Sequence, residues 1–137
     1  MIAMPFNSRC SYLVSLFLVV PCAMPFGCKH LVGVVVIPDT SITTGHLYVT
    51  HKRICDYWNS HGKLPADFED LPVIENRDCS TTDGWGRELL WKSDGARIIE
   101  VYSLGKDGTP GGAGEDCRFS IIFDASNPHR VPEVKED

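Results

Sequence analysis

The sequence predicts an α+β domain in which one long helix packs on a small antiparallel sheet of three strands. Apolar residues recur at helical spacing in the range 44–59, and three short segments between 88 and 123 are rich in β-branched and aromatic residues. Twelve glycines and nine prolines in 137 residues favour short elements joined by turns over a helical bundle. A helix and a sheet that bury one face against each other form a two-layer domain.

The long helix is expected from Thr44 to Asn59. The side chains that would face the core recur three or four residues apart: Leu47, Tyr48, His51, Ile54, Cys55 and Trp58. The threonines that end the preceding segment, PDTSITT, are candidates for the N-cap. Gly62 is expected to end the helix, and Pro65 prevents it from resuming.

Three strands are expected after the helix, at residues 88–92, 97–103 and 119–123. The turn Ser93-Asp94-Gly95 joins the first two strands as a hairpin. The region 63–84, which connects the helix to the sheet, is rich in turn formers and holds one short helical pattern, Ala66–Leu71.

The N-terminal segment has the pattern of an export signal. Residues 11–26 are apolar and uncharged, contain two prolines, and are shorter than the roughly 20 residues of a membrane span. The Gly27-Cys28 junction resembles the end of a bacterial lipobox, which predicts cleavage and lipidation at Cys28. The alternative is an uncleaved membrane anchor, extended by the second apolar run at 31–37.

These observations divide the chain into four parts. They are a leader at 1–27, a linker at 28–43, a globular domain at 44–124 and a polar tail at 125–137, which is expected to fray. The net charge of −5 comes from 13 basic and 18 acidic side chains, so the body would repel phosphates. Binding to nucleic acid or to anionic lipid is therefore disfavoured, and a cation is the more natural ligand.

The six cysteines are consistent with an oxidising compartment. Cys79 and Cys117 both flank loops and are the preferred disulfide pair, whereas Cys55 is expected to be a small buried apolar side chain. A zinc site is disfavoured because there is no CxxC motif and because the histidines at 46, 51 and 61 lack the i, i+4 spacing of helical metal ligands.

The segment 103–116 is the chemically most distinctive part of the chain, with five glycines between 105 and 114. A phosphate loop is excluded, because Gly105-Lys106 is followed by Asp107 instead of Ser or Thr and no helix is expected after the loop. Asp107 and Asp116 lie at opposite ends of the loop, and Ca²⁺ takes carboxylate and carbonyl oxygens as ligands. The residues alone leave two interpretations open, a cation site and a solvated loop with surface acids.

The loop sequence, SLGKDGTPGGAGED, resembles a loop of the major pseudopilin of bacterial type II secretion systems, the protein G family. Two further motifs occur in the family order: GKLP at 62–65 after the helix, and DGWG at 83–86. Tyr102, just before the loop, also matches the family pattern. The resemblance covers residues 44–124.

The resemblance implies a pilin-like globular head with bound calcium. Carried over residue by residue, the side-chain ligands are Asp107 and Asp116, and the backbone carbonyl of Leu104 contributes to the shell. The family often has a further aspartate where this chain has Arg118, and Glu115 is the candidate to compensate for it. The family's long apolar N-terminal helix is missing, because the apolar run after Cys28 ends at Pro38.

The first functional hypothesis is therefore a non-enzymatic, calcium-binding pseudopilin-like domain, exported and lipid-anchored, which works with other secretion-system or envelope proteins and does not polymerise. The second is an envelope protein-binding module that reuses the same head, with Trp85 and Trp91 as interface candidates. An enzyme is disfavoured, because no paired carboxylates or Ser/His/Asp spacing stand out in the sequence.

Overall fold

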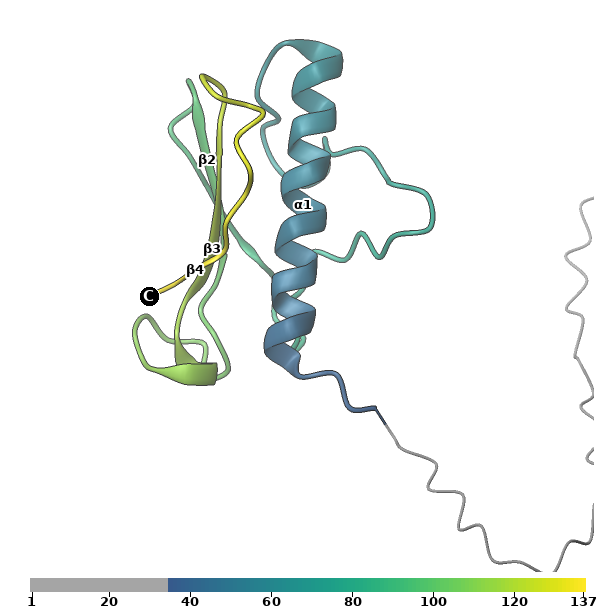
Figure 1. The fold of residues 1–137 in the computed structure, drawn as a ribbon. Helices are drawn as coiled ribbons and strands as arrows, with labels where there is room; N and C mark the ends of the chain where they lie inside the picture. The colour runs from purple at the N-terminus through teal and green to yellow at the C-terminus, as the bar shows by residue number, and fades with distance from the viewer. Residues whose placement is uncertain (1–34) are drawn as a thin grey trace, which may run out of the picture. The chain divides into compact units, whose positions relative to one another are not determined.

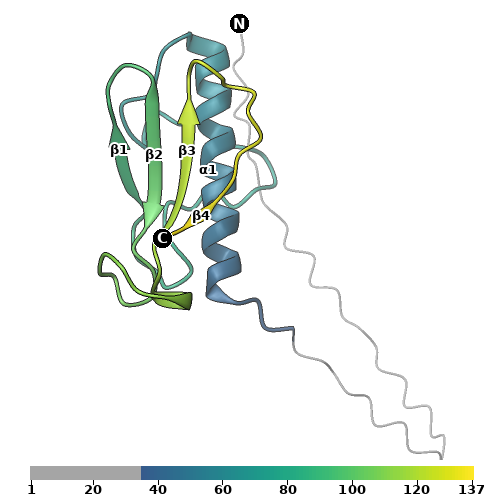
Figure 2. The same cartoon turned by 60° about the vertical axis from the view of Figure 1, so that its left-hand side comes forward.

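A long helix lies along one face of a four-stranded antiparallel sheet (Figure 1). The computed structural model describes residues 35–137; the predicted leader and the Cys28 lipidation site lie outside these residues. The elements in chain order are α1 (Asp39–His61), β1 (Leu90–Ser93), β2 (Ile98–Ser103), the 3₁₀ turn η1 (Gly114–Asp116), β3 (Phe119–Asp124) and β4 (Lys135–Glu136). The strands are ordered β1-β2-β3-β4 across the sheet (Figure 2). The α+β prediction is confirmed, with one strand more than expected.

Helix α1 begins earlier than the sequence predicted. Its N-cap is Pro38, in an extended conformation, whose carbonyl accepts the N–H groups of Ser41 and Ile42 at 2.9 and 3.1 Å. The threonines expected to cap the helix lie inside it, so no side chain caps this end. Gly62 ends the helix as predicted, in the left-handed region at φ 64°, and its N–H donates to the Trp58 carbonyl at 2.8 Å.

The core lies between α1 and the inner faces of β2 and β3. Alternate residues of both strands point toward the helix, as a half-buried antiparallel sheet requires. The apolar side chains from the helix and these two strands that are at most 2% exposed are Leu47, Ile54, Ile99, Val101, Phe119, Ile121 and Phe123. Burying this many apolar groups is the main favourable term for the fold.

The C-terminal segment is part of the sheet, which corrects the prediction of a frayed tail. β4 pairs with β3, and the backbones of Arg118 and Asp137 exchange two hydrogen bonds of 2.9 Å each. Val134 packs partly against the core. The polar composition of residues 125–137 gives no strand pattern, because the pairing of β4 depends on the free edge of β3 and not on local strand propensity.

The expected short helix at Ala66–Leu71 is also absent from the described structure, which has turns there. The Asp67 carboxylate accepts the Glu69 N–H and the Asp70 carboxylate accepts the Ala66 N–H, each at 2.8 Å. Local bonds of this kind compete with the helical hydrogen-bond pattern.

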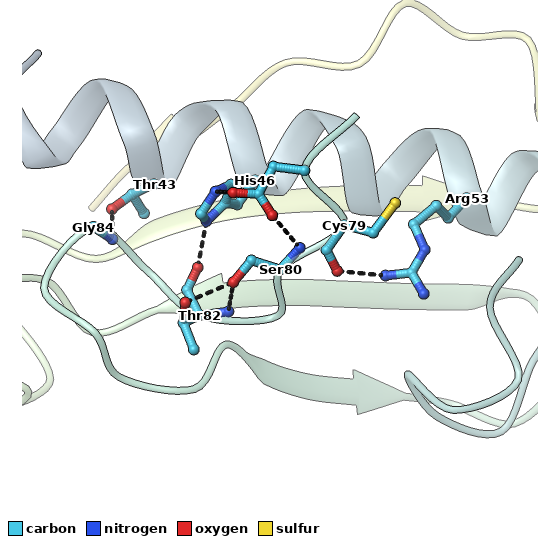
Figure 3. Close-up of polar contacts among 8 residues, drawn as sticks. Thr43, His46, Arg53, Cys79, Ser80, Thr82 and Gly84 are labelled. Carbon is cyan, nitrogen blue, oxygen red and sulfur yellow. Dashed lines mark hydrogen bonds and ion pairs between the residues drawn. The ribbon is translucent and has the colours of Figure 1, made fainter. Parts of the chain in front are cut away.

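Polar side chains of α1 hold the connecting segment 71–84 against the helix (Figure 3). The contacts from the helix drawn there include Gly84 N–H to Thr43 Oγ1 at 2.9 Å, the His46 ring with the Thr82 carbonyl at 2.6 Å, and Arg53 Nη1 to the Cys79 carbonyl at 3.2 Å. Arg53 is 5% exposed and also donates to the carbonyls of Leu71 and Pro72. Backbone carbonyls in an irregular segment are thus satisfied by a buried guanidinium.

The β1–β2 hairpin forms as predicted, and Asp94 fixes its turn. The Asp94 carboxylate accepts the N–H groups of Ala96, Arg97 and Ile98 at 2.8–2.9 Å. These bonds, that from Arg97 first, lower the pKa of Asp94 to about 2.

Asp94→Ala is expected to destabilise the domain in a pH-dependent way. Because the folded pKa lies below that of the unfolded chain, near 3.9, the carboxylate contributes stability above pH ~4, and this contribution is lost as the pH falls toward 2. Urea unfolding of both proteins between pH 2 and 6 checks this. The gap between wild type and variant should narrow over that window, and a gap independent of pH would refute the role given to the ionised carboxylate.

Candidate functional site

The loop at residues 104–118 joins β2 to β3 at the end of the sheet near the first turn of α1 (Figure 2). Its path depends on glycines at two close approaches. A Cβ at Gly105 would lie 2.5 Å from the Cys117 carbonyl oxygen, and one at Gly112 would lie 2.5 Å from that of Asp116. Both glycines have positive φ, at 81° and 123°. The two halves of the loop are therefore folded onto each other.

Backbone and side chains of one residue pair close the loop. The Lys106 N–H donates to the Glu115 carbonyl at 2.7 Å, and the Lys106 ammonium meets the Glu115 carboxylate at 2.8 Å. Asp107 follows the first residue of this pair and Asp116 follows the second. The two predicted calcium ligands are nine residues apart in sequence, and each directly follows one partner of this backbone hydrogen bond.

The Asp107 carboxylate is held in place and ionised. It is exposed, and it accepts the Thr109 hydroxyl at 2.6 Å and the Thr109 N–H at 2.9 Å. These two bonds, together with the charge of Arg87, lower the pKa of Asp107. An ionised carboxylate fixed at a loop surface suits a hard cation.

A buried aspartate supports the base of the loop. Asp83 is 4% exposed, and its carboxylate accepts the N–H groups of Trp85 and Arg87 at 3.0 and 2.9 Å and the Ser103 hydroxyl at 2.8 Å. Ser103 Oγ in turn accepts the Gly105 N–H at 3.1 Å. The 83–87 turn and the first residues of the loop therefore form one hydrogen-bonded unit.

Arg87 adds a second link, because its guanidinium donates to the Gly105 carbonyl at 2.9 Å. The sequence identifies Asp83 only as the first residue of the DGWG motif and does not indicate this role. An aspartate among turn formers looks like a turn residue, and only the fold brings Ser103 to it. The one hint in the sequence is that Asp83 and Ser103 are the first residues of two motifs that belong to the same family resemblance.

Arg118, at the position where the resemblance implied a further aspartate, faces the sheet and the C-terminus. Its guanidinium lies 2.7 Å from the Glu100 carboxylate, 4.2 Å from the centre of the Tyr102 ring and 3.9 Å from the Asp137 carboxylate. The contacts with Glu100 and Tyr102 hold Arg118 against β2, and the contact with Asp137 links it to the residue that follows β4. Arg118 thus has a structural role of its own.

Within residues 35–137 no three His, Cys, Asp or Glu side chains gather as a metal cluster. A calcium site does not need three such side chains, because backbone carbonyls and water commonly complete the coordination shell of the ion. The residue types present suit such a site: Asp107 and Asp116 would supply anionic oxygens, and the glycine-rich loop would supply carbonyls such as that of Leu104. No helix in the described part of the chain is both long and apolar enough to cross a membrane.

The predicted Cys79–Cys117 disulfide is not present. Among the described residues Cys55, Cys79 and Cys117 are all free thiols. Cys117 is 6% exposed and belongs to the core, and the Cys79 sulfur instead contacts the Ile74 backbone, at 3.3 Å from its nitrogen. Placement beside loops in the sequence did not bring these two side chains into a bond.

The two tryptophans proposed as interface residues pack inward. Trp85 lies 6.1 Å from Phe119 and Trp91 lies 5.0 Å from Phe68, measured between ring centres, and both are partly buried against the core. Their indole N–H groups are buried without an acceptor among the described residues. Both residues therefore contribute to packing, and they do not form an open binding face.

Comparison with known protein families gives a match that covers the C-terminal part of the helix, the connecting segment, β1, β2, the loop and the first part of β3. The family model "Type II secretion system (T2SS), protein G" matches residues 52–121, which is half of the chain. No curated protein and no solved structure matches it significantly. The matched range contains the GKLP and DGWG motifs, Tyr102 and the loop with Asp107 and Asp116. The chain therefore belongs to the type II secretion system protein G family, the pseudopilin family to which its loop sequence pointed.

Proposed function

We propose that this protein is a non-enzymatic, calcium-binding pseudopilin-like domain that acts in type II secretion from the cell envelope. The observation that supports this most is the loop within the family match. One residue pair, Lys106 and Glu115, closes it, and an acidic residue follows each member of that pair.

In this proposal Asp107, Asp116 and the Leu104 carbonyl hold Ca²⁺, which supplies positive charge to the acidic loop. The chain's own residues prepare the site. Thr109 orients the Asp107 carboxylate, while Asp83 and Ser103 fix the strand from which the loop departs. The hydrogen bond and negative charge of Glu115, with a smaller effect of Asp116, raise the pKa of Lys106. Its ammonium therefore provides part of the charge balance before a cation binds.

The proposal includes export, with attachment to the membrane through the leader or through a lipid on Cys28. Partners would be other components of the secretion system. Self-assembly into a filament is not part of the proposal, because the apolar run after Cys28 is too short to supply a polymerising helix.

The function is tested in the cell that makes the protein. Deleting the gene should reduce release of type II secretion substrates into the medium while their amounts inside the envelope rise. Re-expression of the unmutated chain should restore release, and the Asp107→Ala/Asp116→Ala double variant should restore it poorly. Unchanged release after deletion would contradict a role in secretion.

A further inference from the structure

The Glu115 side chain is engaged by Lys106 where the loop closes. Its Oε2 accepts the Lys106 ammonium at 2.8 Å, and the backbone carbonyl of the same residue accepts the Lys106 N–H at 2.7 Å. Because one pair of residues forms both bonds, the backbone bond brings the two side chains together. The family resemblance makes Glu115 the candidate to take the place of the acid missing at Arg118, and the structure shows that this carboxylate already has a partner within the chain.

The three carboxylates between residues 107 and 116 have different surroundings. Asp107 is held by two hydrogen bonds from Thr109, at 2.6 and 2.9 Å. Lys106 forms an ion pair with Glu115, and among the described residues no ion pair with a Lys or Arg side chain involves Asp107 or Asp116. The cation supplied by the chain is therefore paired with the one acid of the three that is not a predicted calcium ligand.

The ion pair between Lys106 and Glu115 lies at the surface. The two side chains are 57% and 53% exposed. Exposed ion pairs contribute little to stability, because water competes with them and two long side chains have to be ordered. Glu115 can therefore leave Lys106 without disturbing the core.

We propose that Lys106 lowers the calcium affinity of the loop by holding Glu115 in this ion pair. The inference rests on the proposed calcium site at Asp107 and Asp116. The affinity of a calcium site depends on the number of charged ligands, and Glu115 directly precedes Asp116 in the chain. While Lys106 holds Glu115, the loop is closed by the chain's own charges and offers two carboxylates instead of three.

Removing the ammonium of Lys106 should have two effects of opposite sign. Without calcium, the loop loses the ion pair that helps to close it, so the protein becomes less stable. With calcium, the Glu115 carboxylate is free to join Asp107 and Asp116, so the affinity rises. A residue with a purely structural role would lower the stability and would not raise the affinity.

The test compares the full chain with Lys106→Met, which keeps most of the side-chain length and removes the charge. Calorimetric titration with Ca²⁺ alone should give a dissociation constant about two- to fivefold lower in the variant, the range that corresponds to an exposed ion pair. In the presence of a chelator the variant should melt about 1–5 °C below the unmutated chain.

Lys52→Met is the matched control. Lys52 is also exposed and pairs with a carboxylate, that of Asp56, at 2.8 Å, and it lies on α1. Its loss should lower the melting temperature in chelator by a similar amount and leave the calcium affinity unchanged. The double variant Lys106→Met/Glu115→Gln should lose most of the gain in affinity, since the released carboxylate is then missing.

Three outcomes would overturn the proposal. Equal dissociation constants in the unmutated chain and in Lys106→Met would show that Glu115 is not withheld, and would leave the calcium site itself intact. A gain of the same size in the double variant would mean that the ammonium acts by repelling the cation and not through Glu115. No binding of Ca²⁺ to either protein would remove the calcium site and this inference with it.

Discussion

Asp83→Ala is expected to lower the free energy of unfolding by about 3 kcal/mol or more, since each buried group left unpaired costs roughly 1–3 kcal/mol. The substitution leaves three donors without their acceptor, the N–H groups of Trp85 and Arg87 and the hydroxyl of Ser103. It also frees Ser103, which accepts the Gly105 N–H at the start of the loop. The damage should therefore extend from the 83–87 turn into the candidate calcium site.

Asp83→Asn is the informative comparison. An amide keeps the shape and an acceptor oxygen for the two backbone N–H groups, and its NH₂ can donate to Ser103 Oγ, so it should be considerably milder than alanine. Asp67→Ala is the exposed control, because that carboxylate accepts a single N–H, from Glu69. Chemical denaturation measures all three. Equal losses for Asp83→Ala and Asp67→Ala would mean that the buried network contributes nothing beyond an ordinary turn.

Asp107→Ala is expected to abolish the stabilisation by calcium, and Asp116→Ala is expected to abolish it or greatly weaken it. A ligand that binds only the folded state adds about 2.7 kcal/mol when its free concentration is a hundred times the dissociation constant. For a domain of this size that corresponds to several degrees in melting temperature. Each variant removes one of the two anionic ligands, so the shift should shrink or vanish.

Two controls separate calcium binding from general damage to the loop. Glu115→Gln removes an acid that is paired with Lys106, and the variant should keep most of the calcium response. Mg²⁺ should stabilise the unmutated chain less than Ca²⁺, because it demands tighter octahedral geometry and retains its waters. A calcium response that survives in both aspartate variants would place the ion elsewhere.

Much of the fold could be predicted because it follows from local pattern. The helical spacing of Leu47 and Ile54, the stop at Gly62 and the turn at Asp94 each depend on neighbouring residues. The start of α1 was missed because Thr43, which looks like a cap, is completely buried and instead accepts the N–H of Gly84. Strand β4 was missed because its pairing partner is distant in sequence.

The residues of the candidate site could be named from the sequence only where they stand in a local motif. Asp107 and Asp116 stand in a recognisable loop sequence, whereas the supports from Asp83 and Arg87 join segments about twenty residues apart. The Cys79–Cys117 pairing failed because position beside a loop carries no information about distance.

The most direct test of the account is thermal unfolding of the unmutated chain with Ca²⁺ and with a calcium chelator. The account predicts a melting temperature several degrees higher with calcium, with a difference that grows with calcium concentration. Coincident melting curves would contradict it: the loop closed by Lys106 and Glu115 would then be held by the chain's own charges, and the protein would be a pseudopilin-family domain without the calcium site.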